Sequence, residues 1–392
     1  MKLLRKKVGL IAICDFIDFP PGGEVSFLTS ILKEWKYEDL EIDLIGMTHS
    51  LNENVGNWQK RSIGEKEYNF FPVFKEVREK EKTRIPFRFR MVWGLLKFRK
   101  EIMKKKYDIL YIHCPELILP FLGDNKTVVV YHVHGEPQHT LKVSRFSIFR
   151  FHIFSFLYNT IIKIAITKSK KVIWVSQKAL KSYLGEKYSK EKNIVIPSPY
   201  DSSLFCLCEE DNLVKKTNQI IIFVGRLSAV KNLNLLIDSF KLVREEKKNV
   251  KLILCGDGEE RIKLERYVEE RGLKDDVIFT GYLKREEIRF FLNKADVFVL
   301  TSLKEGSPVC VVEALAMGVP VVTVDVGDVK EIIRDGYNGY VVERYDPVLI
   351  STAIVKILRE GRDKYKENCI KSVLARSPSA IANRVYDVLK SC

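Results

Sequence analysis

Two glutamates eight residues apart stand where a loop turns into a helix, and both could bind a hydroxyl-rich ligand. Glu305 lies on the expected loop, and Glu313 lies just over one turn into an apolar helix. The residues directly after Glu305 are Gly306, Ser307, Pro308 and Val309. Glycine lets the backbone approach a ligand, and proline suits the first turn of a helix. A buried carboxylate needs a partner, and a vicinal diol is one; an ordinary salt bridge is the alternative.

Two cations follow the strand that opens the second half of the chain. Gly225 permits a tight turn after this strand, and Arg226 and Lys231 precede the next expected helix. Free backbone N–H groups at a helix start, together with two cations, favour a diphosphate. A Walker loop is excluded because Gly-Lys-Ser/Thr is absent. A solvated charged loop is the alternative interpretation.

Two further glycine turns give weaker signals. Gly256-Asp257-Gly258 resembles half of a dinucleotide fingerprint, but Arg261 occupies the third glycine position. This pattern fits a tight strand-to-helix turn as well as a nucleotide contact. Gly22 and Gly23 follow the first expected strand, where two glycines opening a helix make an anion-friendly turn or a plain flexible loop.

Four histidines, His113, His132, His134 and His139, fall in one part of the first half. His132 and His134 share a face if their strand persists that far. Glu136 is the only near carboxylate, so no evident metal-ligand set is complete. We therefore expect one histidine at the end of the strand to act in a cleft, and no metal site.

Continuous apolar runs alternate with amphipathic stretches, which is typical of parallel sheets covered on both faces. The chain's 392 residues are too many for one ordinary core. The pattern restarts after a polar segment, residues 201–218, so we predict two α/β domains: 1–200 and 201–372, followed by a C-terminal helix, 373–392, that crosses back to the first domain. Strands are expected at 8–14, 42–47, 108–113, 128–133, 172–175, 194–196, 220–224, 251–255, 277–280, 297–300 and 321–324.

The positive charge is concentrated in the first half. Residues 1–200 hold 35 Lys and Arg against 21 Asp and Glu, whereas the chain as a whole has a net charge of +15. Such a domain suggests an anionic contact: membrane lipid, a phosphate-bearing acceptor or nucleic acid. Basic and aromatic residues interleave from Arg84 to Lys106, which favours a membrane surface, and no RNA-binding signature is present. A helix pair with ordinary charged faces is the alternative.

The eight cysteines form no CxxC pair, which fits a reducing compartment.

The N-terminus is expected to form a buried strand rather than a signal peptide, because its apolar run is short. Residues 151–167 contain polar side chains and are marginally short for a membrane span, so we expect a buried or surface-lying helix. We predict a cytoplasmic location, with peripheral membrane contact.

Together these motifs resemble the retaining glycosyltransferases of family 4, the group 1 transferases with a GT-B fold. The resemblance covers most of the chain and is strongest over residues 220–342. Its most specific part is Glu-Gly-x-Pro-x4-Glu-Ala-x-Ala-x-Gly, from Glu305 to Gly318. It implies two Rossmann-like domains that face each other across a cleft, the first (1–200) binding the acceptor and the second (201–372) binding the nucleotide sugar. The implied reaction transfers a hexose from a nucleotide sugar, a UDP- or GDP-sugar, to a glycan or lipid-linked acceptor with retention of configuration, in cell-surface polysaccharide or glycolipid synthesis.

The same resemblance implies a role for each matching residue. Arg226 and Lys231 would hold the donor diphosphate, Glu305 would bind sugar hydroxyls, and His134 would lie beside the transferred sugar. Glu313 would bind the ribose hydroxyls. Further donor contacts are implied at Gly23, Gly225, Gly256, Gly306, Ser307, Pro308 and Val309. Two cations and a helix start can stabilise the leaving diphosphate, so we expect no metal or other cofactor; no Asp-x-Asp motif occurs.

Departures and rival functions stay open at this point. Pro197-Ser198-Pro199-Tyr200-Asp201 stands where the family often has Pro-Asn-Gly-Val-Asp, which affects the expected linker. A glycoside hydrolase would also need two carboxylates, but they must flank one bond. A basic nucleic-acid-binding protein and an inactive nucleotide-sugar sensor are two further rival functions.

Overall fold

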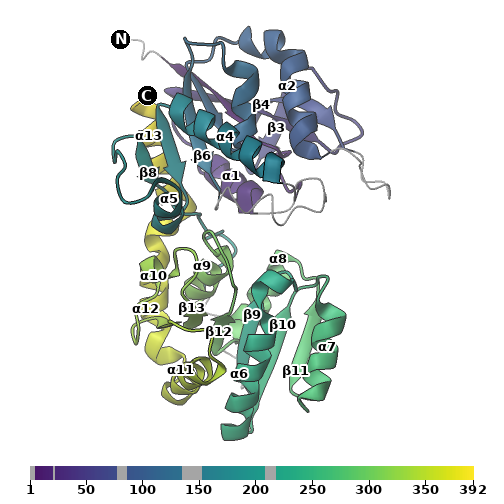
Figure 1. Ribbon diagram of the computed structural model, residues 1–392, viewed down its shortest axis with the longest axis vertical. Helices are drawn as coiled ribbons and strands as arrows, with labels where there is room; N and C mark the ends of the chain where they lie inside the picture. Colours follow the sequence, from purple (N-terminus) through teal and green to yellow (C-terminus); the bar gives the residue numbers. More distant parts are fainter. Residues whose placement is uncertain (1–4, 21–22, 77–85, 135–151, 208–217) are drawn as a thin grey trace. The chain divides into compact units, whose positions relative to one another are not determined.

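The computed structural model describes residues 5–20, 23–76, 86–134, 152–207 and 218–392. They divide into two compact units: residues 1–198 with 378–392, and residues 199–377 (Figure 1). The boundaries expected from the sequence were 200/201 and 372/373. The last helix of the chain, α13 (Pro378–Lys390), belongs to unit 1.

Unit 1 is built on an eight-stranded sheet of order β3-β4-β2-β1-β5-β6-β7-β8, parallel except for the β3–β4 pair. Its strands are β1 (Lys6–Ile11), β2 (Leu40–Thr48), β3 (Gln59–Ile63), β4 (Lys66–Lys75), β5 (Ile109–Ile112), β6 (Val128–Val133), β7 (Lys171–Trp174) and β8 (Asn193–Val195). Its helices are α1 (Gly23–Lys33), α2 (Phe87–Met103), the 3-10 helix η1 (Pro115–Phe121), α4 (His152–Lys168), α5 (Gln177–Leu184) and α13.

Both faces of this sheet are buried, as the continuous apolar runs predicted. In β1, Val8 and Leu10 join one core cluster and Ile11 joins the other, because successive side chains point to opposite faces. The first cluster includes residues of α1 and α13, and the second includes residues of α2, η1, α4 and α5. The first strand is shorter than expected, because it ends at Ile11 and not at residue 14.

Unit 2 has a six-stranded, fully parallel sheet of order β11-β10-β9-β12-β13-β14. This is the doubly wound Rossmann order, whose direction reverses between β9 and β12. Its strands are β9 (Gln219–Val224), β10 (Val250–Cys255), β11 (Val277–Gly281), β12 (Val297–Leu300), β13 (Val321–Val324) and β14 (Gly339–Val342).

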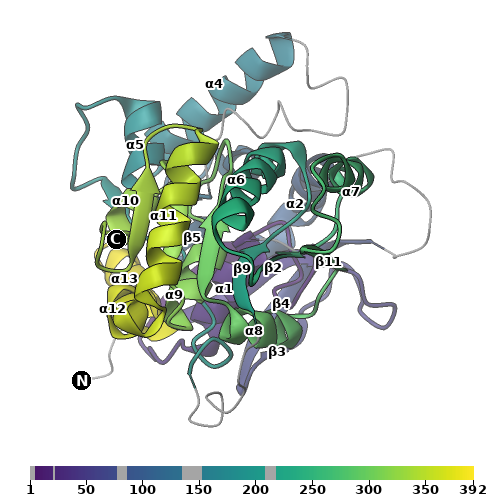
Figure 2. The same ribbon diagram turned by 90° about the horizontal axis from the view of Figure 1, so that it is seen from below.

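The helices of unit 2 follow its strands in alternation. They are η4 (Ala229–Lys231), α6 (Leu233–Glu246), α7 (Arg261–Glu270), α8 (Arg285–Lys294), α9 (Val309–Ala316), α10 (Val329–Ile332), α11 (Pro347–Glu360), α12 (Asp363–Val373) and η5 (Leu374–Arg376). Helices α6 and α11 lie side by side (Figures 1 and 2), and α12 packs on α9. The expected class, two Rossmann-like domains, is confirmed.

The sequence missed three strands. Strands β3 and β4 form a hairpin in a region that matched no readable pattern, and Pro72 inside β4 argues against a strand on propensity. Strand β14 is short and begins at Gly339. Among the described helices, none combines the length and the apolar character that crossing a bilayer requires.

Helix α13 should stabilise unit 1 through its apolar face. Leu389 is fully buried among α1 side chains, so we expect Leu389→Ala to lower the free energy of unfolding of unit 1 by about 2–5 kcal/mol. All four tryptophans lie before residue 175, so their fluorescence during urea unfolding reports unit 1 alone. The exposed neighbour Asp387→Ala is the matched control. Equal unfolding of the two variants would contradict this packing.

Candidate functional site

Two loops meet at the point where the strand order of unit 2 reverses. Strands β9 and β12 are hydrogen-bonded neighbours, and a ligand of an open α/β sheet binds outside the carboxyl ends of such strands. The N–H of Leu303 donates to the Val230 carbonyl (2.8 Å), and the Thr301 hydroxyl lies 3.1 Å from the Lys231 and Asn232 carbonyls. The loop after β12 is therefore fixed to the loop after β9.

An ion pair joins the two predicted catalytic side chains of these loops. Lys231 Nζ lies 2.6 Å from Glu305 Oε1, and the Ser302 hydroxyl donates to the same oxygen over 2.7 Å. Both charged side chains are more than four-fifths buried. Burial alone would lower the pKa of Lys231, but the Glu305 carboxylate outweighs it, so the pKa of Lys231 is raised. Lys231 therefore stays cationic, and its ammonium group is held in place by Glu305.

A third loop, after β10, packs on the first through its backbone. A Cβ on Gly256 would lie 2.0 Å from the Gly225 carbonyl oxygen, so only glycine fits there. The Leu227 N–H donates to the Asp257 carbonyl over 2.9 Å, which ties the same loops together. The packing of Gly256 is explained by this backbone contact, and its role as a donor contact stays a prediction.

The start of α9 forms the other wall of the site. The helix begins at Val309, and the Val311 N–H donates to the Pro308 carbonyl over 3.0 Å. The N–H groups of Val309 and Cys310, at the very start of the helix, have no acceptor within it. Pro308 is the N-cap residue and not the first helical residue, which corrects the expected position by one. A Cβ on Gly327 would lie 2.6 Å from the Gly306 carbonyl oxygen, so the loop after β13 supports Gly306 from behind.

The hydroxyl of Ser307 is held by a buried ion pair that the sequence did not reveal. Ser307 Oγ donates to Asp328 Oδ2 over 2.9 Å, and Arg376 Nη1 lies 2.6 Å from the same oxygen. Asp328 and Arg376 are both at least nine-tenths buried. Ser307 is thereby fixed beside the start of α9.

Glu313 is buried and has a partner from α8. Arg285 Nη2 donates to its Oε1 over 2.9 Å, and Asp201 lies 3.9 Å from the same guanidinium. Burial raises the pKa of Glu313 to about 7, although Arg285 acts against this shift and Asp201 acts with it. The salt-bridge alternative is thus realised here, but the carboxyl group is only partly ionised at neutral pH.

Arg226 is the most exposed of the predicted donor residues with a charge. Its side chain is about half exposed, and its Nη2 lies 2.9 Å from Glu259 Oε2. Exposed ion pairs contribute little to stability, so Arg226 can exchange Glu259 for another anion at small cost.

Gly23 and His134 lie in unit 1. Gly23 opens α1, and a Cβ there would meet nothing within 4 Å, so packing in the described residues does not demand glycine. His134 Nε2 lies 2.7 Å from His113 Nδ1, and burial lowers the pKa of His134 to about 3. His134 is therefore neutral at physiological pH.

Three histidines of unit 1, His113, His132 and His134, form a stack. His132 and His134 lie parallel, with ring centroids 4.3 Å apart, and His132 Nδ1 lies 2.6 Å from the Tyr111 hydroxyl. One ring nitrogen from each of His113, His132 and His134 lies within 4.8 Å of the others. Parallel rings direct their lone pairs side by side rather than toward one ion. The absence of a metal site stays a prediction, and Gly135, Glu136 and His139 lie outside the described residues.

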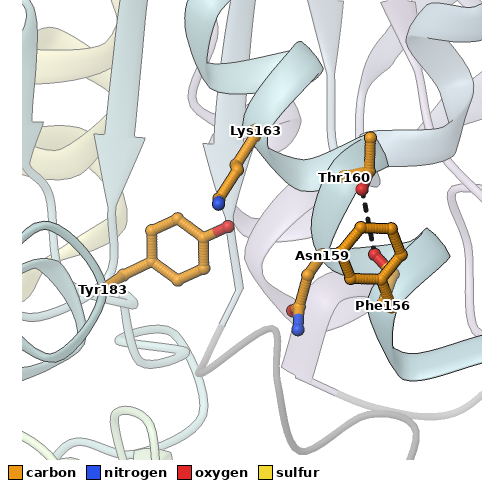
Figure 3. Close-up of a pocket in the computed structure, with 5 residues that line it drawn as sticks. All are labelled: Phe156, Asn159, Thr160, Lys163 and Tyr183. Carbon is orange, nitrogen blue, oxygen red and sulfur yellow. Dashed lines mark hydrogen bonds between the residues drawn. The ribbon is translucent and has the colours of Figure 1, made fainter. Parts of the chain in front are cut away.

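A pocket of unit 1 is lined by none of these residues. It is lined by Phe156, Asn159, Thr160 and Lys163 of α4 and by Tyr183 of α5, and Lys163 points toward the Tyr183 hydroxyl (Figure 3). Its lining has one cation, Lys163, so it provides fewer positive partners for a diphosphate than the loops of unit 2 do.

Sequence reasoning missed Arg285, Asp328 and Arg376. Arg285 stands in a charged run that is typical of a solvent-exposed helix start. Asp328 lies 48 residues before Arg376, and no local sequence pattern indicates that the two side chains meet. The burial of these side chains would have singled them out, but a single sequence does not show which polar residues are buried.

Comparison with known proteins finds similarity to glycosyltransferases. Residues 209–373 match the family model of glycosyl transferases group 1. An uncharacterized glycosyltransferase of Methanocaldococcus jannaschii is 28% identical over 68% of this chain and 66% of its own length. The poly(glycerol-phosphate) alpha-glucosyltransferase of Bacillus subtilis is 32% identical over 169 residues, which are 42% of this chain and 25% of that protein.

Solved structures show the same fold over nearly the whole chain. A sucrose-phosphate synthase from Thermosynechococcus elongatus has a TM-score of 0.79 at 18% identity and covers 99% of both chains. Anabaena HepE in complex with UDP has a TM-score of 0.69 at 18% identity, covering 99% of this chain and 100% of its own. Residues 209–373 are therefore similar to the group 1 glycosyltransferases, and the chain has the GT-B fold.

Proposed function

We propose that this chain transfers a hexose-type sugar from a nucleotide sugar, a UDP- or GDP-sugar, to a glycan or lipid-linked acceptor with retention of configuration. The observation that carries the proposal is the Lys231–Glu305 pair beside the start of α9, at the strand reversal of a group 1 domain. HepE, which has the same fold, was solved with UDP, UDP-glucose and glucose.

The chemistry follows from the charges at this edge of the sheet. Cleavage of the anomeric bond leaves a nucleoside diphosphate, whose growing negative charge needs positioned positive partners. Arg226, Lys231 and the N-terminus of α9 supply them, so we expect transfer without a metal ion. Glu305 then accepts hydrogen bonds from the sugar, and Glu313 accepts them from the ribose.

We further propose that unit 1 rests on the anionic, cytoplasmic face of a membrane. Helix α2 exposes Phe89, Trp93 and Leu96 at helical spacing, and Trp93 is 74% exposed. Helix α4 exposes Phe156 and Leu157, with Phe156 at the edge of the pocket in Figure 3. The flanking cations are Lys97, Lys100, Lys104 and Lys163. Apolar anchors among lysines are typical of interfacial helices.

Nucleotide binding is tested by thermal shift. One of UDP, GDP, ADP and TDP should raise the melting temperature of the chain, because it binds only the native state. Lys231→Ala should weaken this binding about tenfold or more, as loss of a charged hydrogen bond to phosphate does. Lys263→Ala, on the exposed face of α7, is the control. If no nucleotide at millimolar concentration changed the melting temperature, the proposed donor site would be contradicted, and a hydrolase or a nucleic-acid-binding protein would be favoured.

The contribution of Glu313 should depend on pH. Its pKa of about 7 means that it becomes a full acceptor for ribose hydroxyls only as pH rises from 6 to 8. The preference for the bound nucleotide over its 2′,3′-dideoxy form should therefore increase over this range, since phosphate titration is common to both ligands. Glu313→Gln should abolish the pH dependence. A preference that stays constant with pH in the native chain would exclude this role.

Membrane contact is tested by vesicle flotation. The chain should bind vesicles containing anionic lipid at low salt and release them at high salt. The double variant Trp93→Ser/Phe156→Ser should lose most of this binding, whereas Tyr282→Ser in unit 2, equally exposed, should not. Binding that is unaffected by the double variant would show that these helices are not the contact.

A further inference from the structure

Two aspartates and a histidine of unit 1 gather after two neighbouring strands. Asp15 and Asp18 lie in the loop after β1, and His49 directly follows β2, which pairs with β1. One ligand atom from each of these three residues lies within 4.8 Å of the other two. The cluster shares no residue with the histidine stack, where no metal site is expected, or with the donor loops of unit 2.

The Asp15 carboxylate is fully buried, and only one of its oxygens is satisfied. Its Oδ1 accepts hydrogen bonds from the backbone N–H groups of Ile17, Asp18 and Phe19, over 2.9, 3.1 and 2.9 Å. These bonds hold the carboxylate in one orientation. Its Oδ2 has no hydrogen-bond donor among the described residues. A buried oxygen without a donor is costly, so a partner is expected at Oδ2.

His49 approaches this oxygen without forming a hydrogen bond. Its Nδ1 lies 2.7 Å from Asp15 Oδ2, yet neither atom has a hydrogen-bond partner among the described residues, because the orientation of the two groups is not that of an N–H···O bond. Two ligands of one metal ion are arranged in this way. Each points at the ion from about 2.1 Å, so the two atoms lie about 3 Å apart without pointing at each other.

The charge and the exposure of the cluster also favour a cation. Within the part of the chain that the structure describes, no lysine or arginine forms an ion pair with Asp15 or Asp18. Asp18 is exposed, and 28% of the His49 side chain is exposed, so an ion can enter from this side although Asp15 is buried. A metal ion occupies only the space between its ligand atoms, so it needs no larger cavity.

We infer that Asp15, Asp18 and His49 form a binding site for a divalent transition-metal ion of the Zn²⁺ class. One imidazole nitrogen and two carboxylate oxygens suit Zn²⁺ and its first-row neighbours, whereas Mg²⁺ and Ca²⁺ prefer oxygen ligands alone. Bound there, the ion ties the loop after β1 to the end of β2 and stabilises unit 1. The inference does not rest on the proposed function, and no step of the proposed sugar transfer uses this ion.

The test is a metal titration of the full chain, purified without a histidine tag and treated with a chelator. We expect Zn²⁺ at micromolar concentration to raise the melting temperature of unit 1, followed by tryptophan fluorescence, because the ion binds the native state. Co²⁺ serves as a spectroscopic probe. It should give visible d–d bands without the thiolate charge-transfer band that binding at a cysteine produces. Mg²⁺ and Ca²⁺ should have no effect at the same concentration.

Single variants identify the ligands. His49→Ala and Asp18→Asn change side chains that are at least partly exposed, so both variants should fold. Each should weaken Zn²⁺ binding at least about tenfold, since even a change behind the ligands of a metal site costs about 10–100-fold in affinity. Asp387→Asn, an exposed aspartate of the same unit, should bind Zn²⁺ like the native chain.

Two results would overturn the inference. Unchanged Zn²⁺ affinity in His49→Ala or in Asp18→Asn would show an adventitious ion bound elsewhere. A native chain that binds no Zn²⁺ would show that His49 and Asp15 form a plain ion pair.

Discussion

One buried ion pair fixes the chemistry of unit 2. Lys231 and Glu305 are 74 residues apart in sequence, and they meet only because β9 and β12 are neighbours in the sheet. The pair is shielded from water, so its attraction is little screened, and removing either partner would leave a buried charge. The strand order thus determines both the position of Lys231 and its charged state.

The other charges of the site are also paired. Glu259 holds Arg226, Arg285 holds Glu313, and Arg376 holds Asp328. A ligand that brings two phosphates and several hydroxyls can enter only by sharing or replacing these partners. The half-exposed Arg226 pair is the easiest to exchange, whereas the buried Asp328 pair is not available and acts on Ser307. The site therefore has one charge that a ligand can take over, Arg226, and one buried ion pair, Asp328–Arg376, that stays in place.

Sequence predicted the parallel strands well, because strands buried on both faces appear as continuous apolar runs. It also selected Lys231 and Glu305, which the fold brings together. It failed where the signal was not local: the β3–β4 hairpin contains Pro72, and Arg285 looks like an ordinary surface residue. The partners of the site residues come from distant segments, and only the tertiary fold shows which charge meets which.

The two units divide the polar chemistry between them. Unit 2 gathers Arg226 and Lys231 at a helix start, and unit 1 holds the neutral histidines His113, His132 and His134 at the ends of β5 and β6. The central claim concerns unit 2 and is tested most directly by a crystal structure of the chain with its bound nucleoside diphosphate. We predict phosphate oxygens within hydrogen-bond distance of Lys231 and the start of α9, and ribose hydroxyls on Glu313. A nucleotide bound away from these residues would contradict the account.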